Sequence, residues 1–223
     1  MNLALFDLDG TLIPKDSDHA FGEFVITLGW ADAASFRRRN DGFYADYLAG
    51  RLDIDAYVDF ATAPWRDRRD GELQRAMAGF LEIVIKPMLH PQALALVRQH
   101  QAAGDLVAVV TATNDFVTRP IARLFGVDEL IATELARDAN DRVTGRIHGI
   151  PSFREGKITR VQAWLAARGQ VLADFEHSHF YSDSTNDLPL LERVSKPVAT
   201  NPGPELERIA LQRGWPVLKL FSP

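Results

Sequence analysis

The 223-residue sequence contains no cysteine. This absence excludes disulfides, thiolate metal ligands and cysteine nucleophiles, and it fits a reducing compartment. Basic residues are also in deficit, because 25 Lys and Arg stand against 30 Asp and Glu, which gives a net charge of −5. A nucleic-acid-binding domain needs a basic surplus, so we expect no nucleic-acid partner.

Long hydrophobic runs are absent as well, since none approaches the ~20 residues needed to span a bilayer. The chain opens on a strand-like stretch at residues 2–6, without the basic leader or small-residue cleavage site of a signal peptide. We therefore expect a cytoplasmic protein with no membrane partner. The pattern leaves the oligomeric state open between a monomer and a homodimer.

Short apolar runs, each followed by a polar turn, predict strands at residues 3–6, 106–110, 130–132, 179–181, 197–199 and 217–220. Helical periodicity lies between several of them, at residues 91–103, 115–125, 155–167 and 202–213. Strands that are apolar on both faces and alternate with helices are typical of a parallel sheet covered on both sides. We expect an α/β fold with a Rossmann-like three-layer α/β/α core and a mostly parallel sheet.

Residues 16–85 interrupt this alternation, because their apolar positions recur at helical spacing and no strand pattern is present. The segment is far longer than the dozen or so residues that a βαβ crossover needs. Pro14 precedes it and Pro87 follows it. The pattern predicts an inserted all-helical cap. The expected domains are a cap at residues 15–86 and an α/β catalytic core at residues 1–14 and 87–223.

Two aspartates follow the first predicted strand, in Asp7-Leu8-Asp9-Gly10-Thr11. Strand side chains alternate, so Asp7 and Asp9 start on the same side, at the sheet edge where open α/β proteins bind ligands. Two carboxylates this close require a cation or a shared proton. One alternative is a solvated turn, and another is a calcium loop, although the remaining loop ligands are missing. The placement after a strand favours a catalytic role.

Two later segments offer groups that bind phosphate. The strand at residues 106–110 leads into Thr111 and Ala112, whose hydroxyl and free backbone N–H could hold a phosphate; a threonine N-cap is the alternative. Lys157, one of only five lysines, lies near the start of a predicted helix. It could supply positive charge, although a solvated lysine is the ordinary alternative and Arg154 or Arg160 could replace it.

An acidic loop follows the predicted strand at residues 179–181 and contains Asp183, Asn186 and Asp187. Such hard oxygen ligands suit Mg²⁺, which proteins usually hold through one or two carboxylates together with substrate phosphate. The alternative is an Asx-rich turn that caps the next helix. Each of the four segments follows a parallel strand at one sheet edge, so together they predict a single site.

These four motifs resemble those of the haloacid dehalogenase-like (HAD) phosphohydrolases, in the branch that contains phosphoserine phosphatases and histidinol-phosphate phosphatases. The resemblance covers the whole chain, including a helical cap between the first and second motifs. It implies a phosphomonoester hydrolase that acts on a small phosphorylated metabolite through an aspartyl-phosphate intermediate and Mg²⁺. A phosphotransferase to an acceptor alcohol would share every motif. A non-catalytic phosphometabolite-binding module is a further alternative, against which the intact motif set argues.

The resemblance also implies residue roles. Asp7 is the nucleophile and Asp9 the general acid and base, a carboxylate that the dehalogenase branch lacks. The implied Mg²⁺ ligands are the Asp7 carboxylate, the Asp9 backbone carbonyl and the Asp183 carboxylate. The other implied site residues are Thr111, Ala112 and Lys157 at the phosphate, and Asn186 and Asp187 as supports behind the metal.

The cap carries the expected substrate contacts. Asp16 lies nine residues after the nucleophile, where phosphoserine phosphatases place a Glu that contacts the substrate amine. The same enzymes have a cap Arg for the substrate carboxylate, and an ungapped count from the stretch at 50–52 places Asp59 there. Arg66 or Arg51 could take the place of that Arg. We expect an amine-bearing phosphate, with histidinol phosphate as the leading candidate and phosphoserine as the alternative.

Overall fold

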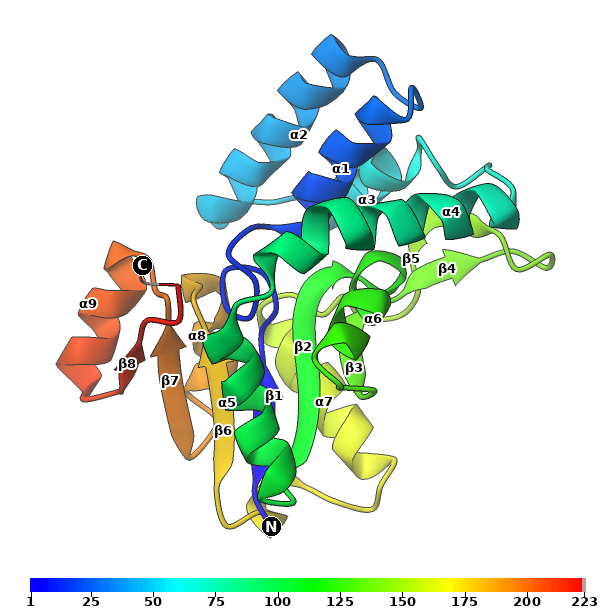
Figure 1. Cartoon of the computed structure of the whole chain (residues 1–223). Coiled ribbons are helices and arrows are strands. Elements are labelled where there is room, and N and C mark those ends of the chain that lie inside the picture. Colours follow the sequence, from blue (N-terminus) through cyan, green and yellow to red (C-terminus); the bar gives the residue numbers. More distant parts are fainter. Residues whose placement is uncertain (222–223) are drawn as a thin grey trace.

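The computed structural model describes residues 1–221 and contains a six-stranded sheet in the order β3-β2-β1-β6-β7-β8 (Figure 1). All neighbouring strands in this sheet are parallel. Its strands are β1 (Leu3–Phe6), β2 (Leu106–Asn114), β3 (Leu130–Thr133), β6 (Ser178–Ser182), β7 (Lys196–Thr200) and β8 (Val217–Leu218). The predicted α/β class with a mostly parallel sheet is confirmed.

Helices cover both faces of this sheet because alternate side chains of β1 point to opposite faces. Ala4 and Phe6 belong to the hydrophobic cluster that includes α5 (Pro91–Ala102) and α6 (Asp115–Leu124). Leu3 and Leu5 belong to the opposite cluster. The helices of that second layer are α7 (Glu155–Ala166), α8 (Leu188–Leu191) and α9 (Pro204–Arg213). Every residue of β1 is buried, which explains its uninterrupted apolar sequence.

The long helical segment lies over the carboxyl-terminal edge of the sheet (Figure 1). Its helices are α1 (Ser17–Thr27), α2 (Ala33–Leu48), α3 (Ile54–Thr62) and α4 (Asp70–Phe80), followed by a π turn at Leu81–Ile85 and a 3₁₀ turn at Lys86–Met88. Residues 15–86, all within the described chain, contain no strand. Trp65 stacks on Phe116 of α6 at 4.3 Å, so the helical segment and the core share one hydrophobic cluster. That this segment is a separate cap domain remains a prediction.

Several elements differ from the predicted pattern. An antiparallel hairpin of β4 (Leu135–Arg137) and β5 (Val143–Ile147) was not expected, and β5 packs beside α3. The remaining 3₁₀ turns lie at Leu172–Asp174 and Thr185–Asp187.

Within residues 1–221 no single helix is long and apolar enough to cross a membrane. One pair of helices, Asp70–Met88 and Pro91–Ala102, bent by 95°, reaches that length and composition jointly.

Candidate active site

Asp7 follows β1 directly and is only 4% exposed. Its backbone N–H donates to the Tyr181 carbonyl of β6 at 2.9 Å, which extends the parallel ladder to the sheet edge. Gly10 then turns the chain with φ +74°, and a Cβ there would lie 2.2 Å from the Asp183 carboxylate. Only glycine allows the backbone to pass this close in this conformation. The loop after β1 therefore carries the Asp7 carboxylate and passes close to the Asp183 carboxylate.

Lys157 is the buried cation of the site, with 1% of its surface exposed. Its Nζ lies 2.8 Å from Asp7 Oδ1 and 2.8 Å from both carboxylate oxygens of Asp187. The Ser182 hydroxyl donates to Asp187 Oδ2 at 2.7 Å. Burial opposes the charge of Lys157, but Asp187 and Asp7 outweigh it and the pKa of the lysine is raised. Asp187 thus holds the ammonium group of Lys157 in contact with Asp7.

The two arginines considered as substitutes for Lys157 are engaged elsewhere. Arg154 donates to the backbone carbonyl of Gly50, and Arg160 pairs with Glu134 at 2.5 Å. Neither contact is with Asp7, so the lysine is the charge that reaches this carboxylate.

Asp7 and Asp183 share one small polar space, because the Thr11 hydroxyl lies 3.4 Å from Asp7 Oδ2 and 3.2 Å from Asp183 Oδ1. The Asp183 backbone N–H also donates to this hydroxyl at 3.0 Å. Burial, Asp7 and Asp187 raise the pKa of Asp183 well above its usual range. Asp7, Asp183 and Asp187 therefore influence one another, while Lys157 contacts only Asp7 and Asp187, which leaves a surplus of negative charge.

This surplus fits a divalent cation. Among residues 1–221 no group of three or more His, Cys, Asp or Glu side chains is placed so that it could hold a metal ion. Two carboxylates and a backbone carbonyl, completed by substrate phosphate and water, are nevertheless the usual environment of Mg²⁺. The donor set at Asp7, Asp9 and Asp183 matches that environment.

The Asp9 carboxylate is held by two hydrogen bonds. The Ser17 backbone N–H donates to Oδ1 at 2.8 Å, and the Thr113 hydroxyl donates to Oδ2 at 2.9 Å. Burial, followed by the charge of Asp16, raises the pKa of Asp9 to about 7. A carboxyl group with this pKa can donate and accept a proton near neutral pH. Thr113 was not predicted from the sequence, although it lies two residues after Thr111.

Strand β2 continues to Asn114, further than the sequence indicated, and its pairing with β3 shifts register between Val110 and Asn114. The side chain of Asn114, not that of Thr111, caps α6 by accepting the Val117 N–H at 3.1 Å. Thr111 is buried and, with Ala112, lines the same pocket as Asp7 and Asp9. Both residues therefore lie in the pocket that contains Asp7, and their contact with phosphate remains a prediction.

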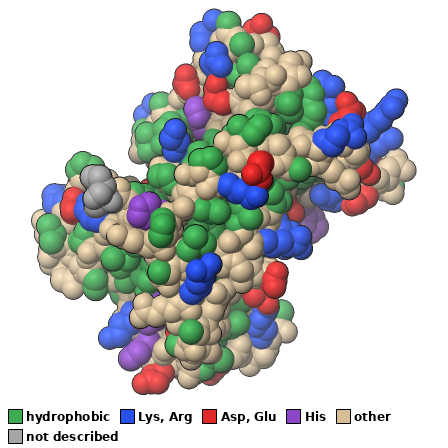
Figure 2. Space-filling view, viewed as in Figure 1, with side chains coloured by type: hydrophobic (Ala, Val, Ile, Leu, Met, Phe, Trp, Pro, Cys, Tyr) green, Lys and Arg blue, Asp and Glu red, His purple; other side chains and the backbone are tan. Residues whose placement is uncertain are grey.

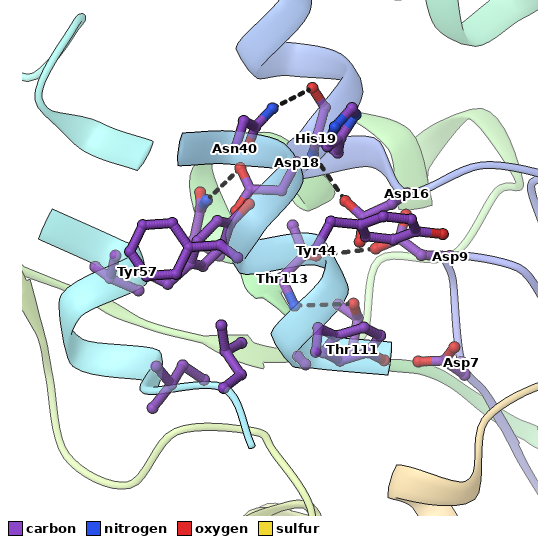
Figure 3. A pocket seen from close by; sticks show the side chains of 17 residues that line it. Asp7, Asp9, Asp16, Asp18, His19, Asn40, Tyr44, Tyr57, Thr111 and Thr113 are labelled. Atoms are coloured by element: carbon purple, nitrogen blue, oxygen red, sulfur yellow. Dashed lines mark hydrogen bonds between the residues drawn. The ribbon is translucent and has the colours of Figure 1, made fainter. Parts of the chain in front are cut away.

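The pocket that Asp7 and Asp9 line lies between the sheet edge and helices α1, α2 and α3 (Figure 3). Its acidic lining residues are Asp7, Asp9, Asp16 and Asp18. Its aromatic lining residues are Phe43, Tyr44, Tyr47 and Tyr57. No lysine or arginine within the described range lines it. Basic residues gather instead over α4 and the β4–β5 hairpin, around a groove that contains Arg119 and Arg142 (Figure 2). The pocket therefore favours cations beside a phosphate.

Asp16 and Asp59, the two expected substrate contacts, lie in different environments. Asp16 lines the pocket and caps α1, with its Oδ1 accepting the His19 N–H at 2.7 Å. Asp59 does not line the pocket; its side chain is 67% exposed and pairs with Arg66 at 2.5 Å. The residues of α3 that line the pocket are Ile54, Tyr57 and Val58, and Asp59 is not among them. The ungapped count to Asp59 therefore requires correction.

The residues considered as replacements for the cap arginine are also outside the pocket. Arg66 is the partner of Asp59, and Arg51 pairs with Asp46 at 2.8 Å. Asn186, expected behind the metal, instead donates to the Tyr47 carbonyl of α2 at 3.1 Å and accepts from Arg154 Nε at 3.4 Å. It joins the acidic loop to the helical segment.

Comparisons with known proteins show the family and the fold. The family model for haloacid dehalogenase-like hydrolases matches residues 4–192. A histidinol-phosphatase of Neisseria meningitidis serogroup C (strain 8013) is 48% identical over 217 residues, which cover 97% of this chain and 98% of that protein. A crystal structure of a protein of unknown function from Bordetella pertussis Tohama I has 51% identity and a TM-score of 0.93, with 99% of both chains covered.

A phosphoserine phosphatase in the form of a phospho-aspartyl intermediate analogue shares the fold, with a TM-score of 0.66 at 17% identity, over 97% of this chain and 92% of that one. The family match covers most of the chain, and the acidic site lies at the sheet edge where this fold binds its ligands. The chain belongs to the haloacid dehalogenase-like hydrolase family and is a phosphatase of small phosphorylated substrates.

Proposed function

We propose that this phosphatase hydrolyses histidinol phosphate, with Mg²⁺ as its cofactor and an aspartyl-phosphate intermediate on Asp7. The pocket carries the proposal, because it joins Asp7 and Asp9 to two further carboxylates, Asp16 and Asp18, and no lysine or arginine of residues 1–221 lines it. The 48% identity to the Neisseria histidinol-phosphatase supports the same substrate. A phosphate ester with a cationic amine would match this charge distribution.

In the proposed reaction, a carboxylate oxygen of Asp7 attacks phosphorus while the bond from phosphorus to the alcohol oxygen breaks. Asp9 gives its proton to the departing alcohol. Lys157 and the Ala112 N–H stabilise the negative charge on the phosphoryl oxygens, and Thr111 adds a hydroxyl donor. Asp9, now a carboxylate, takes a proton from the water that attacks phosphorus, which releases phosphate and restores Asp7. Bound Mg²⁺, held by Asp7, Asp183 and the Asp9 carbonyl, would neutralise charge on the transferring group.

Phosphoserine differs from histidinol phosphate in ways that the pocket would distinguish. Both carry an ammonium group, but phosphoserine also carries a carboxylate, which would meet Asp16 or Asp18 and find no arginine. Unit charges 4 Å apart interact by about 4 kcal/mol at an effective dielectric of about 20, and solvent reduces that value. The carboxylate should therefore make phosphoserine the poorer substrate.

We predict that kcat/KM for histidinol phosphate exceeds that for phosphoserine by roughly tenfold to a hundredfold, which corresponds to about 1–3 kcal/mol. Steady-state kinetics with both esters on the wild-type enzyme provide the measurement. Asp59→Asn serves as the control and should leave the ratio unchanged, because Asp59 lies outside the pocket. A phosphoserine value equal to or above that of histidinol phosphate would exclude this substrate assignment.

Removal of the metal should abolish turnover. Without a cation, Asp7, Asp183 and Asp187 repel one another beside a single lysine. We expect activity to vanish in excess chelator and to return when Mg²⁺ is added in excess of it. Asp183→Ala should raise the Mg²⁺ concentration required for half-maximal activity by at least ~10-fold. Full activity in excess chelator would rule out the proposed cofactor.

A further inference from the structure

Asp18 is a buried acidic residue of the pocket that the proposed hydrolysis does not use. It lies in the first turn of α1 and is only 6% exposed. The Asn114 side-chain amide donates to its Oδ1 at 3.1 Å, and an interaction with the Tyr57 hydroxyl lowers its pKa. Both partners are neutral. The carboxylate therefore has hydrogen bonds but no fixed positive charge.

A buried carboxylate without a cation is costly, because burial disfavours its ionised form. Burial, together with the charge of Asp9, raises the pKa of Asp18 to about 7, although hydrogen bonding opposes the shift. A structural role at the start of α1 accounts for little of this arrangement, since Asp16 already caps that helix. Asn114 caps α6 through its side-chain oxygen Oδ1, so the cap of α6 does not need Asp18 either. A positive group supplied by the ligand would offset the cost.

The two carboxylates of α1 serve different parts of the pocket. Figure 3 shows Asp16 on the side toward Asp9, and Asp18 on the side toward Tyr57. Flat and apolar side chains, including Phe43 and Val58, surround the pocket. An aromatic ring of the ligand could pack against such walls while one of its N–H groups donates to a carboxylate. The pocket thus offers two separate acceptors for nitrogen donors.

We propose that Asp18 determines specificity by binding a second nitrogen group of the substrate, the N–H of an imidazole-type ring, while Asp16 binds the ammonium group. The inference rests on the proposed function and narrows its substrate class to phosphate esters that carry both an amine and a nitrogen heterocycle. Asp18 is a substrate contact of the pocket and takes no part in phosphoryl transfer.

Three substrates separate these roles. Histidinol phosphate carries an amine and an imidazole, 2-aminoethyl phosphate carries only an amine, and p-nitrophenyl phosphate carries neither. We expect Asp18→Asn to lower kcat/KM for histidinol phosphate at least ~10-fold, mainly through KM, and to change the other two by less than about twofold. Asp16→Asn should weaken both amine-bearing esters. Asp55→Asn, an exposed change on α3, is the matched control and should alter none of the three.

A second variant, Asp18→Ser, tests whether the loss arises from misfolding, and the substrate preference of the wild type tests the proposed function separately. Asp18→Ser should reproduce the loss confined to histidinol phosphate. An equal loss with all three substrates, or no loss with histidinol phosphate, would overturn the role of Asp18. If wild type prefers histidinol phosphate and Asp18→Asn keeps that preference, only this inference fails. If wild type shows no preference for histidinol phosphate over 2-aminoethyl phosphate, the proposed function fails and the inference falls with it.

Discussion

Asp7→Asn should lower kcat by at least ~10⁴-fold while the protein remains folded. A carboxamide cannot attack phosphorus, and it cannot act as an anionic metal ligand. Burial raises the pKa of Asp7 to about 7 although Lys157 opposes the shift, so the neutral amide should be tolerated in the ligand-free fold. The measurement is kcat with histidinol phosphate and with p-nitrophenyl phosphate, together with thermal unfolding of the purified variant.

A loss of kcat with both substrates would place the defect in the chemical step, since the substrates share only the phosphate. Asp59→Asn provides the matched carboxylate change, because Asp59 is exposed and outside the pocket. Substantial turnover by a clean, folded Asp7→Asn preparation would be incompatible with attack by this residue.

Lys157→Met should impair both stability and turnover. The change keeps a long apolar stem but removes the one ammonium group that lies between Asp7 and Asp187. Loss of one partner from a buried ion pair costs about 3–5 kcal/mol of unfolding free energy, because the remaining charge is left without compensation. Loss of a donor to the phosphoryl oxygens should lower kcat by a further ~10²–10³-fold. Urea unfolding and steady-state kinetics measure the two effects separately.

Lys86→Met is the control for Lys157→Met. Lys86 pairs with Glu82 at 2.5 Å on the surface, where both side chains are more than half exposed. Such a pair contributes about 0–1 kcal/mol, so its loss should barely change the unfolding midpoint or kcat. A Lys157→Met variant with the stability and turnover of this control would contradict the role assigned to Lys157.

The central strands could be predicted because β1 and most of β2 are buried on both faces and therefore begin with uninterrupted apolar sequences, as in Leu3–Phe6. The β4–β5 hairpin could not. Its strands are short, and Val143–Ile147 alternates buried residues with exposed ones around a glycine and an arginine. Such a pattern is weak within a sequence dominated by parallel strands and helices. The long helical segment was evident from its periodicity and length.

The catalytic edge could be predicted because parallel strands bring their carboxyl ends together, which places Asp7, Thr111 and Asp183 in one region. Residues outside the strand ends were harder to place. Each helical residue rotates by roughly 100°, so a count along the sequence does not show which side chains of α3 face the pocket, and Asp59 lies outside it. Asp18 resembles an ordinary acid at a helix start, and only the packing of α1 against Asn114 reveals its burial.

Trapping the phosphoenzyme tests the central claim most directly. Enzyme quenched in acid during turnover and reduced with borohydride should yield a peptide in which Asp7 has become homoserine, because borohydride reduces an acyl phosphate but leaves a free carboxylate intact. The account predicts this change at Asp7 only, dependent on substrate and absent from Asp7→Asn. An unmodified Asp7 during active turnover, or modification at another carboxylate, would contradict it.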